Sequence, residues 1–225
     1  MAVAGVEVVG RPDLPLHVRH VEPQSPAGVA GVVRGDQVLA LNGRPASELI
    51  SANDFSLLTA ERSGQTLALL LQGTGGQRTV TLAAAVYRLS PVPRSAVVYT
   101  PGGRPVGYLM VKDMITQAIT PATEAFSRFR AAGVRELVVD LRYNGGGLVS
   151  VGRDLASLVA GVRAVGATYS SLLYNNRQAA QWNTSYAFTR SADALGLARV
   201  YLLVGSRTCS ASEQLANGLR PYVDV

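Results

Sequence analysis

The sequence has few of the side chains that form disulfides or hold metals. One cysteine cannot form a disulfide within the chain, and two histidines, His17 and His20, leave too few ligands for a zinc site. No apolar run is both long enough and free enough of charge to span a bilayer. The first residues, MAVAGVEVVGRPDLP, lack the basic and apolar segments of a signal peptide. We therefore expect no metal, and the classes of disulfide scaffold and membrane span are excluded.

The charged residues include very little lysine. Lysine and arginine together number 21 against 15 acidic residues, which gives a formal net charge of +6, yet Lys112 is the only lysine. A basic charge suits nucleic acid, but the arginines are scattered singly, without a basic run or interleaved aromatics. We therefore expect no nucleic-acid partner. Apolar residues make up 48% of the chain, which is enough for a sizeable core.

The first ninety residues are rich in strand and turn signals. LPLHVRHV alternates as a strand does, and QVLALNG reads as a strand that ends in the turn Asn42-Gly43. Ser25-Pro26 opens a short helix or turn at AGVAGV. TLALLLQGTGGQRTVTLAAAVY predicts a β-hairpin around residues 73–76. These signals indicate a small β-rich domain over residues 1–88.

This part of the chain resembles a bacterial PDZ domain, through the stretch SPAGVAGVVRGDQVLALNGRPA. The resemblance covers about residues 1–86. It implies capture of a peptide C-terminus, which adds as a strand and whose carboxylate is held by backbone N–H groups. It would place the carboxylate loop near Ala4, Gly5 and Val6. The alternative is a β-rich domain whose glycines serve turns and which binds no peptide.

A change of pattern follows this domain. Residues 89–105 hold four prolines, one of them in a Pro-Gly-Gly turn, so we expect an extended or exposed linker there. Residues 106–225 then alternate strands and helices, which predicts parallel βα units. The expected strands are VGYLMV, ELVVDLRY, ATYSSLLYNN and RVYLLVG; the expected helices include ITPATEAFSRFRAAG, with Thr120 as its cap, and SASEQLANGLRPY.

The glycine-rich stretch DLRYNGGG, residues 140–147, lies between a buried strand and a helix. Glycines there let the backbone turn tightly and present N–H groups that can bind phosphate or stabilise an oxyanion. No Gly-Lys-Ser/Thr follows and the G-x-G-x-x-G spacing is absent, so neither nucleotide motif is present. We expect no cofactor. The alternative is a turn that only lets the helix pack on the sheet.

The stretch TCSASE, residues 208–213, lies where a strand ends and a helix begins. Ser210 and Glu213 fit a capping box, which needs no catalysis. The run of small residues also leaves space for another chain, and a serine there lies at the positive end of the helix dipole. If Ser210 is a nucleophile, the N–H of Ala211 would face the oxyanion formed there. Cys209 is interpreted as a small filler beside the serine.

Together these motifs resemble the C-terminal processing, or tail-specific, proteases. The resemblance implies an α/β fold with a Clp protease/crotonase-like core preceded by the PDZ-like domain. It implies a Ser-Lys dyad with Ser210 as nucleophile and an oxyanion hole from Ala211 and Gly145 or Gly146. The lysine base of this family follows the nucleophile, whereas no lysine follows Ser210 here.

We therefore expect the base beyond Val225 and the core to be incomplete at its C-terminal end. On this interpretation residues 1–225 alone bind protein or peptide C-termini weakly and cleave nothing, and association with another copy is expected. The family resemblance further implies a bacterial cell envelope or periplasmic enzyme. The alternative is a non-catalytic peptide-binding scaffold of the same fold.

Overall fold

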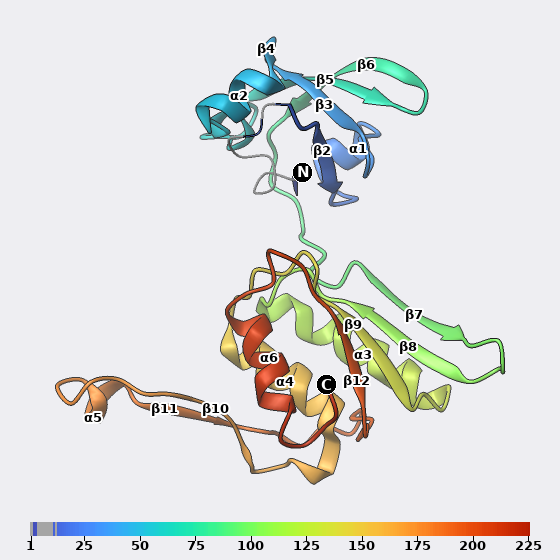
Figure 1. Ribbon diagram of the computed structural model, residues 1–225, viewed down its shortest axis with the longest axis vertical. Helices are drawn as coiled ribbons and strands as arrows, with labels where there is room; N and C mark the ends of the chain where they lie inside the picture. Colours follow the sequence, from blue (N-terminus) through green and yellow to red (C-terminus); the bar gives the residue numbers. More distant parts are fainter. Residues whose placement is uncertain (1, 4–10, 12) are drawn as a thin grey trace. The chain divides into compact units, whose positions relative to one another are not determined.

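The computed structural model describes residues 2–3, 11 and 13–225. They form two compact units, residues 1–89 and residues 90–225 (Figure 1).

The first unit is built on an antiparallel sheet whose strands run in the order β1-β2-β3-β5-β6, with β4 paired to β3. Its strands are β1 (Ala2–Val3), β2 (Leu16–His20), β3 (Gln37–Leu41), β4 (Arg44–Pro45), β5 (Thr66–Gly73) and β6 (Gly76–Ala83). Its helices are α1 (Pro26–Val29), α2 (Ala46–Ala52) and the 3₁₀ turn η2 (Ser56–Leu58).

Turn chemistry accounts for much of this unit. Asn42 and Gly43 both have positive φ, 48° and 79°, and join β3 to β4. The Asn42 side chain accepts a hydrogen bond from the N–H of Ala68 at 2.8 Å, which ties the turn to β5. Ser25 caps α1, because its hydroxyl oxygen accepts from the N–H of Gly28. The predicted strands and the hairpin around residues 73–76 are confirmed.

A separate apolar core fills the first unit. It gathers side chains from strands β2, β3 and β5 and helix α2, namely Leu16, Val18, Val38, Leu41, Leu49, Ile50, Leu69 and Leu71. Asp36 is buried beside it, paired with Arg78 and accepting from the N–H of Val33 at 2.9 Å. The unit therefore has the sheet and the buried core of an independent small domain.

The second unit is built on a four-stranded sheet in the order β12-β9-β8-β7. Its strands are β7 (Arg94–Tyr99), β8 (Pro105–Met110), β9 (Glu136–Asp140) and β12 (Val200–Leu203). The inner pairs β8–β9 and β9–β12 are parallel, as predicted, and β7 pairs antiparallel with β8. The predicted linker, residues 89–105, therefore contains strand β7.

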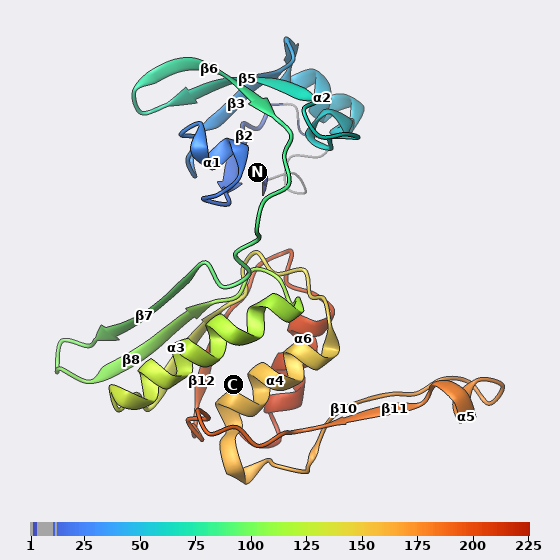
Figure 2. The same ribbon diagram turned by 180° about the vertical axis from the view of Figure 1, so that it is seen from behind.

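Helices α3 (Ile119–Ala131), α4 (Val149–Ala160) and α6 (Ala211–Leu219) lie on one side of this sheet (Figures 1 and 2). α3 packs against β8 and β7, and α4 packs against α3 and α6. Gly107 allows the close approach, because a Cβ there would lie 3.2 Å from the ring of Phe129. The 3₁₀ turns η3 (Thr116–Ala118) and η4 (Gly161–Arg163) flank α3 and α4.

The prediction that Thr120 caps α3 is wrong. The 3₁₀ turn η3 runs directly into the helix, so Ala118 occupies the N-cap and no side chain caps this end. Thr120 lies inside the first turn. The predicted C-terminal stop is correct, since Gly133 has a φ of 71° just after the helix.

The remaining elements form an arm. β10 (Thr168–Leu172) and β11 (Thr184–Ala187) pair antiparallel in a two-stranded sheet of their own, and α5 (Ala179–Trp182) lies between them. Both views show this hairpin extending away from the helices (Figures 1 and 2). The predicted strand at ATYSSLLYNN is thus present but does not join the parallel sheet.

Candidate active site

Two loops meet at one edge of the parallel sheet. Strand β9 ends at Asp140 and leads into the glycine loop, residues 141–148; its neighbour β12 ends at Leu203 and leads into the serine loop, residues 204–210. The carboxyl ends of adjacent parallel strands lie side by side, so the loops that follow them are neighbours. The Thr208 hydroxyl ties them, because it donates to the carbonyl oxygen of Leu141 at 2.8 Å.

Ser210 lies on a strained turn at the start of α6. Its φ of 55° and ψ of −125° are sparsely populated for a residue with a side chain. The residue is exposed. Glu213 supports the turn: its carboxylate accepts from the N–H of Ser210 at 2.8 Å, and its own N–H donates to the carbonyl oxygen of Ser210. The predicted capping box of Ser210 and Glu213 is therefore present.

Gly146 packs directly against Ser210. A Cβ on Gly146 would lie 2.7 Å from the Cβ of Ser210, 2.9 Å from the carbonyl oxygen of Cys209 and 3.0 Å from the nitrogen of Ala211. Its φ of 104° is also a conformation that side chains rarely adopt. The structure therefore brings the adjacent residues Ser210 and Ala211 against the glycine loop, so that two parts of the predicted site that lie far apart in the sequence meet.

The backbone N–H groups near Ser210 differ in what they already bind. The N–H of Gly146 donates to Oδ1 of Asn144 at 2.8 Å. Among the described residues, no acceptor lies within hydrogen-bond reach of the N–H of Ala211, Gly145 or Gly147. Ala211 begins α6, so its N–H is one of the free donors at the positive end of a helix. Sequence reasoning did not single out Gly147, although it belongs to the same glycine run.

A buried carboxylate anchors the start of the glycine loop. Asp140 receives hydrogen bonds from the Arg142 guanidinium at 2.7 Å and from the Tyr108 hydroxyl at 2.7 Å. Burial alone would raise the pKa of Asp140, but these bonds outweigh it and hold the pKa below its ordinary value. Arg142 and Asp140 therefore anchor the start of the glycine loop.

The sequence also holds one thiol, one amine side chain and two imidazoles, each of which could in principle act as nucleophile or base. Cys209 is exposed, and its Sγ lies 3.0 Å from the carbonyl oxygen of Gly145. Lys112 forms an ion pair with Asp113 at 2.5 Å. His17 and His20 belong to the first unit. No group of three or more histidine, cysteine or acidic side chains suited to a metal occurs in residues 2–3, 11 and 13–225.

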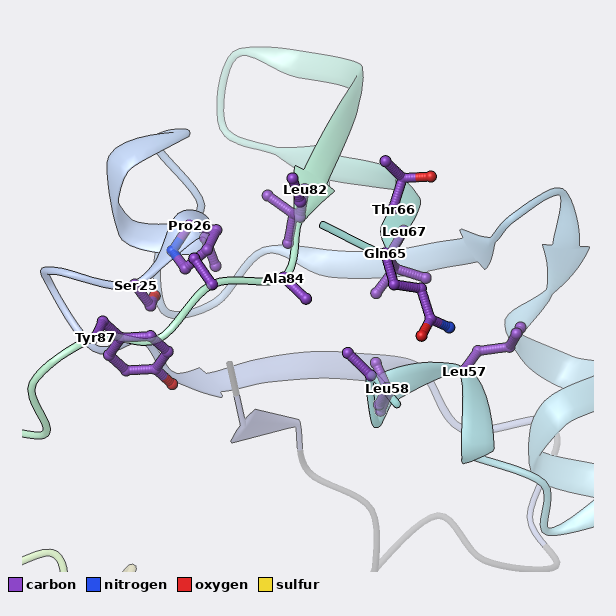
Figure 3. A pocket seen from close by; sticks show the side chains of 14 residues that line it. Ser25, Pro26, Leu57, Leu58, Gln65, Thr66, Leu67, Leu82, Ala84 and Tyr87 are labelled. Carbon is purple, nitrogen blue, oxygen red and sulfur yellow. The ribbon is translucent and has the colours of Figure 1, made fainter. Parts of the chain in front are cut away.

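The first unit holds a pocket of its own, of about 280 Å³. Its walls come from α1, η2 and the facing ends of β5 and β6, and include Leu57, Leu58, Leu67, Leu82 and Tyr87. Figure 3 shows Ser25, Pro26 and Tyr87 at one end and Leu57, Leu58 and Gln65 at the other. The lining mixes polar groups such as Ser25, Gln65 and Thr66 with apolar side chains, and its apolar part suits an apolar side chain. The predicted carboxylate loop at Ala4, Gly5 and Val6 lies outside the described residues.

No helix within the described part of the chain has the length and the apolar surface that a membrane crossing would require.

Comparison with known proteins divides the chain into the same two units as the structure. The model of peptidase family S41 matches residues 105–223, and that of the PDZ domain matches residues 3–72. A carboxyl-terminal-processing protease of Synechocystis sp. is 30% identical over 198 residues, which are 87% of this chain and 44% of that protein. The chloroplastic carboxyl-terminal-processing peptidase 1 of Arabidopsis thaliana is also 30% identical, over 87% of this chain and 38% of its own length. The chain thus spans less than half the length of these relatives.

Solved structures agree with the fold. A putative S41 protease from Bacteroides fragilis superimposes with a TM-score of 0.73 at 26% identity, over 94% of this chain and 57% of that one. A photosystem II D1 C-terminal processing protease superimposes with a TM-score of 0.52 at 24% identity and shows the same fold. The predicted fold class, a Clp-like α/β core with a PDZ-like domain, is confirmed. With the S41 model matching more than half of its length, this chain belongs to peptidase family S41.

Proposed function

We propose that the complete gene product is a serine endopeptidase that cleaves proteins near their C-termini, with Ser210 as nucleophile. The observation that carries the proposal is the strained, exposed turn at Ser210, packed against the glycine loop and followed by the free N–H of Ala211. The names of the relatives support the same activity, since they are carboxyl-terminal-processing proteases. A cap alone would not require backbone strain.

In the proposed reaction the base removes the proton of the Ser210 hydroxyl as Oγ attacks the scissile carbonyl carbon. The carbonyl electrons move to oxygen, and the resulting oxyanion accepts from the N–H of Ala211 and from one glycine N–H. Collapse returns the electrons, breaks the C–N bond and leaves an acyl-enzyme, and the base gives its proton to the departing amine. Water then hydrolyses the ester by the same steps.

The glycine donor is proposed from the hydrogen bonds already present. Gly145 and Gly146 both follow from the family resemblance, but the Gly146 N–H is held by Asn144. This favours Gly145 as the second donor, with Gly147 as an equivalent candidate from the same loop. Gly146 is then the residue whose missing side chain gives room for Ser210.

The base is proposed to be a lysine of the complete gene product outside these 225 residues. Lys112, the lysine present, is paired with Asp113. On this proposal residues 1–225 alone bind peptide and cleave nothing. The test compares hydrolysis of a C-terminal peptide by the complete product, by residues 1–225 and by the Ser210→Ala variant of each. Cleavage only by the complete product with Ser210 intact supports the dyad. A folded complete product that binds peptide and never cleaves it would favour a non-catalytic scaffold.

The PDZ unit is proposed to bind the free C-terminus of the substrate, with its carboxylate near Ala4, Gly5 and Val6 and an apolar side chain in the pocket. The apolar lining at Leu58, Leu67 and Leu82 supports this. Peptides with free and amidated C-termini test it, and equal affinity would contradict carboxylate capture. Leu58→Glu should weaken binding, whereas Val29→Glu, at a position 81% exposed, should not.

Location and self-association are proposed together with this activity. We place the enzyme in a bacterial cell envelope or periplasm, which fractionation of the source cells would test. Self-association is supported by the exposed apolar side chains of the hairpin arm, Leu173 (76%), Tyr174 (45%) and Trp182 (51%). Sedimentation showing a clean monomer, unchanged by Trp182→Ser, would contradict it.

A further inference from the structure

The three central peptide groups of the glycine loop are each held by a different part of the second unit. The carbonyl oxygen of Asn144 accepts from the Ser212 hydroxyl at 3.3 Å. That of Gly145 accepts from the Cys209 thiol at 3.0 Å, and that of Gly146 accepts from the N–H of Met114 at 3.1 Å. The contacts therefore come from helix α6, from the serine loop and from the segment after β8.

These contacts fix the directions of the N–H groups. In a planar trans peptide the N–H of one residue points opposite to the carbonyl of the residue before it. Holding the carbonyls of residues 144, 145 and 146 therefore orients the N–H groups of Gly145, Gly146 and Gly147. The Gly146 N–H points to Asn144 Oδ1, while those of Gly145 and Gly147 have no acceptor within the described part of the chain.

Two buried side chains, Asn144 and Ser212, contribute to this arrangement. Asn144 is fully buried: its amide donates to the carbonyl oxygen of Val111 at 3.0 Å while Oδ1 accepts from Gly146. Ser212 is 1% exposed and lies one residue after Ala211, so its hydroxyl joins the first turn of α6 to the loop. A run of three glycines has many accessible backbone conformations. The contacts of Asn144 and Ser212 therefore restrict the orientation of the loop relative to Ala211.

We propose that Asn144 and Ser212 are positioning residues, which hold the glycine-loop N–H groups and the Ala211 N–H at the spacing that an oxyanion requires. The inference rests on the proposed peptidase activity. Neither side chain needs to touch substrate. Their effect falls on the transition state, because preorganised donors stabilise the charge that develops there and contribute little to binding of the uncharged substrate.

The test uses the complete gene product and two matched serine-to-alanine variants. Ser212 and Ser157 are each 1% exposed, and each hydroxyl donates to a backbone carbonyl, of Asn144 and of Arg153. Ser157 lies in α4, and its hydroxyl also accepts from the N–H of Thr189, away from the glycine loop. Each variant is assayed for kcat and KM on a peptide, for inhibition by a peptide boronate, whose tetrahedral adduct carries the oxyanion, and for thermal unfolding.

For Ser212→Ala we expect kcat and boronate affinity to fall by about tenfold, with KM within about twofold of the wild type. Ser157→Ala should change none of the three by more than about twofold. Asn144→Ala should show the same split with a larger loss. Because it also leaves the Gly146 N–H without its acceptor and lowers stability, Ser212→Ala is the deciding variant.

The outcomes distinguish failure of the proposed peptidase activity from failure of the positioning role alone. If wild-type enzyme neither hydrolyses peptide nor binds the boronate, the proposed function fails and the positioning role fails with it. If the wild type does both and Ser212→Ala matches Ser157→Ala, only the positioning role is wrong. If Ser212→Ala instead raises KM and lowers boronate affinity and thermal stability together, Ser212 has a merely structural role. That result would also overturn the positioning role.

Discussion

Replacing Gly146 by alanine tests the contact between the two loops most severely. The added Cβ would lie 2.7 Å from the Cβ of Ser210 and 3.0 Å from the nitrogen of Ala211. The optimal separation of nonbonded carbon atoms is about 3.5–4.0 Å, so the two loops must move apart by roughly 1 Å. Overpacking costs about 1–3 kcal/mol, and the φ of 104° adds a similar backbone strain. We expect the free energy of unfolding to fall by roughly 2–6 kcal/mol.

The same displacement should reduce catalysis in the molecules that remain folded. A shift of about 1 Å at a reacting group can lower the rate by about a hundredfold. The assay is the rate of fluorophosphonate labelling of the complete gene product, measured beside urea unfolding. The control is Gly102→Ala in the turn between β7 and β8, where a Cβ would meet only the Thr100 hydroxyl at 4.0 Å. A Gly146→Ala enzyme with wild-type stability and wild-type labelling would refute the proposed geometry.

Three further predictions concern polar groups of the second unit. The Tyr169 hydroxyl is buried without a hydrogen-bond partner among the described residues, so Tyr169→Phe should raise the free energy of unfolding by about 1 kcal/mol. Tyr108→Phe should lower it by a similar amount, because that hydroxyl donates to Asp140 at 2.7 Å; equal effects of the two substitutions in urea unfolding would contradict the assignment. The pKa of Asp140 is held below its ordinary value of about 3.9, so its contribution to stability is complete above that pH and is lost as the pH falls below it. Wild-type stability should therefore fall more steeply than that of Asp140→Asn in urea titrations below pH ~4, and identical slopes would count against this ion pair.

Local signals in the sequence predict much of both units. The alternation in β2 and β3, the turn at Asn42-Gly43 and the glycines of the β5–β6 hairpin each report a short-range preference, and all are present. The βα units β8–α3 and β9–α4 and the strand–helix pair β12–α6 follow from apolar runs bounded by glycines and, at α6, by the capping box. The motif at Ser210 could be singled out as the proposed nucleophile because a strand-to-helix junction is itself a local feature.

Strand pairings and hydrogen bonds between residues far apart in the sequence cannot be predicted from these local patterns. β7 was not predicted, because nearby prolines and a Pro-Gly-Gly turn are typical of a linker, whereas pairing with β8 makes the segment an edge strand. β10 reads as another strand of the parallel sheet, yet its partner is β11. The contacts of Asn144 join residues 33 and 68 positions apart, and no local pattern encodes them.

The most direct test of the account is to label the complete gene product with a fluorophosphonate and to locate the modified residue by mass spectrometry. The account predicts one labelled peptide, TCSASEQLANGLRPY, modified at Ser210, and no labelling of a folded Ser210→Ala variant. Modification at Cys209 or at another serine, or labelling that persists in Ser210→Ala, would contradict the assignment of Ser210 as the nucleophile.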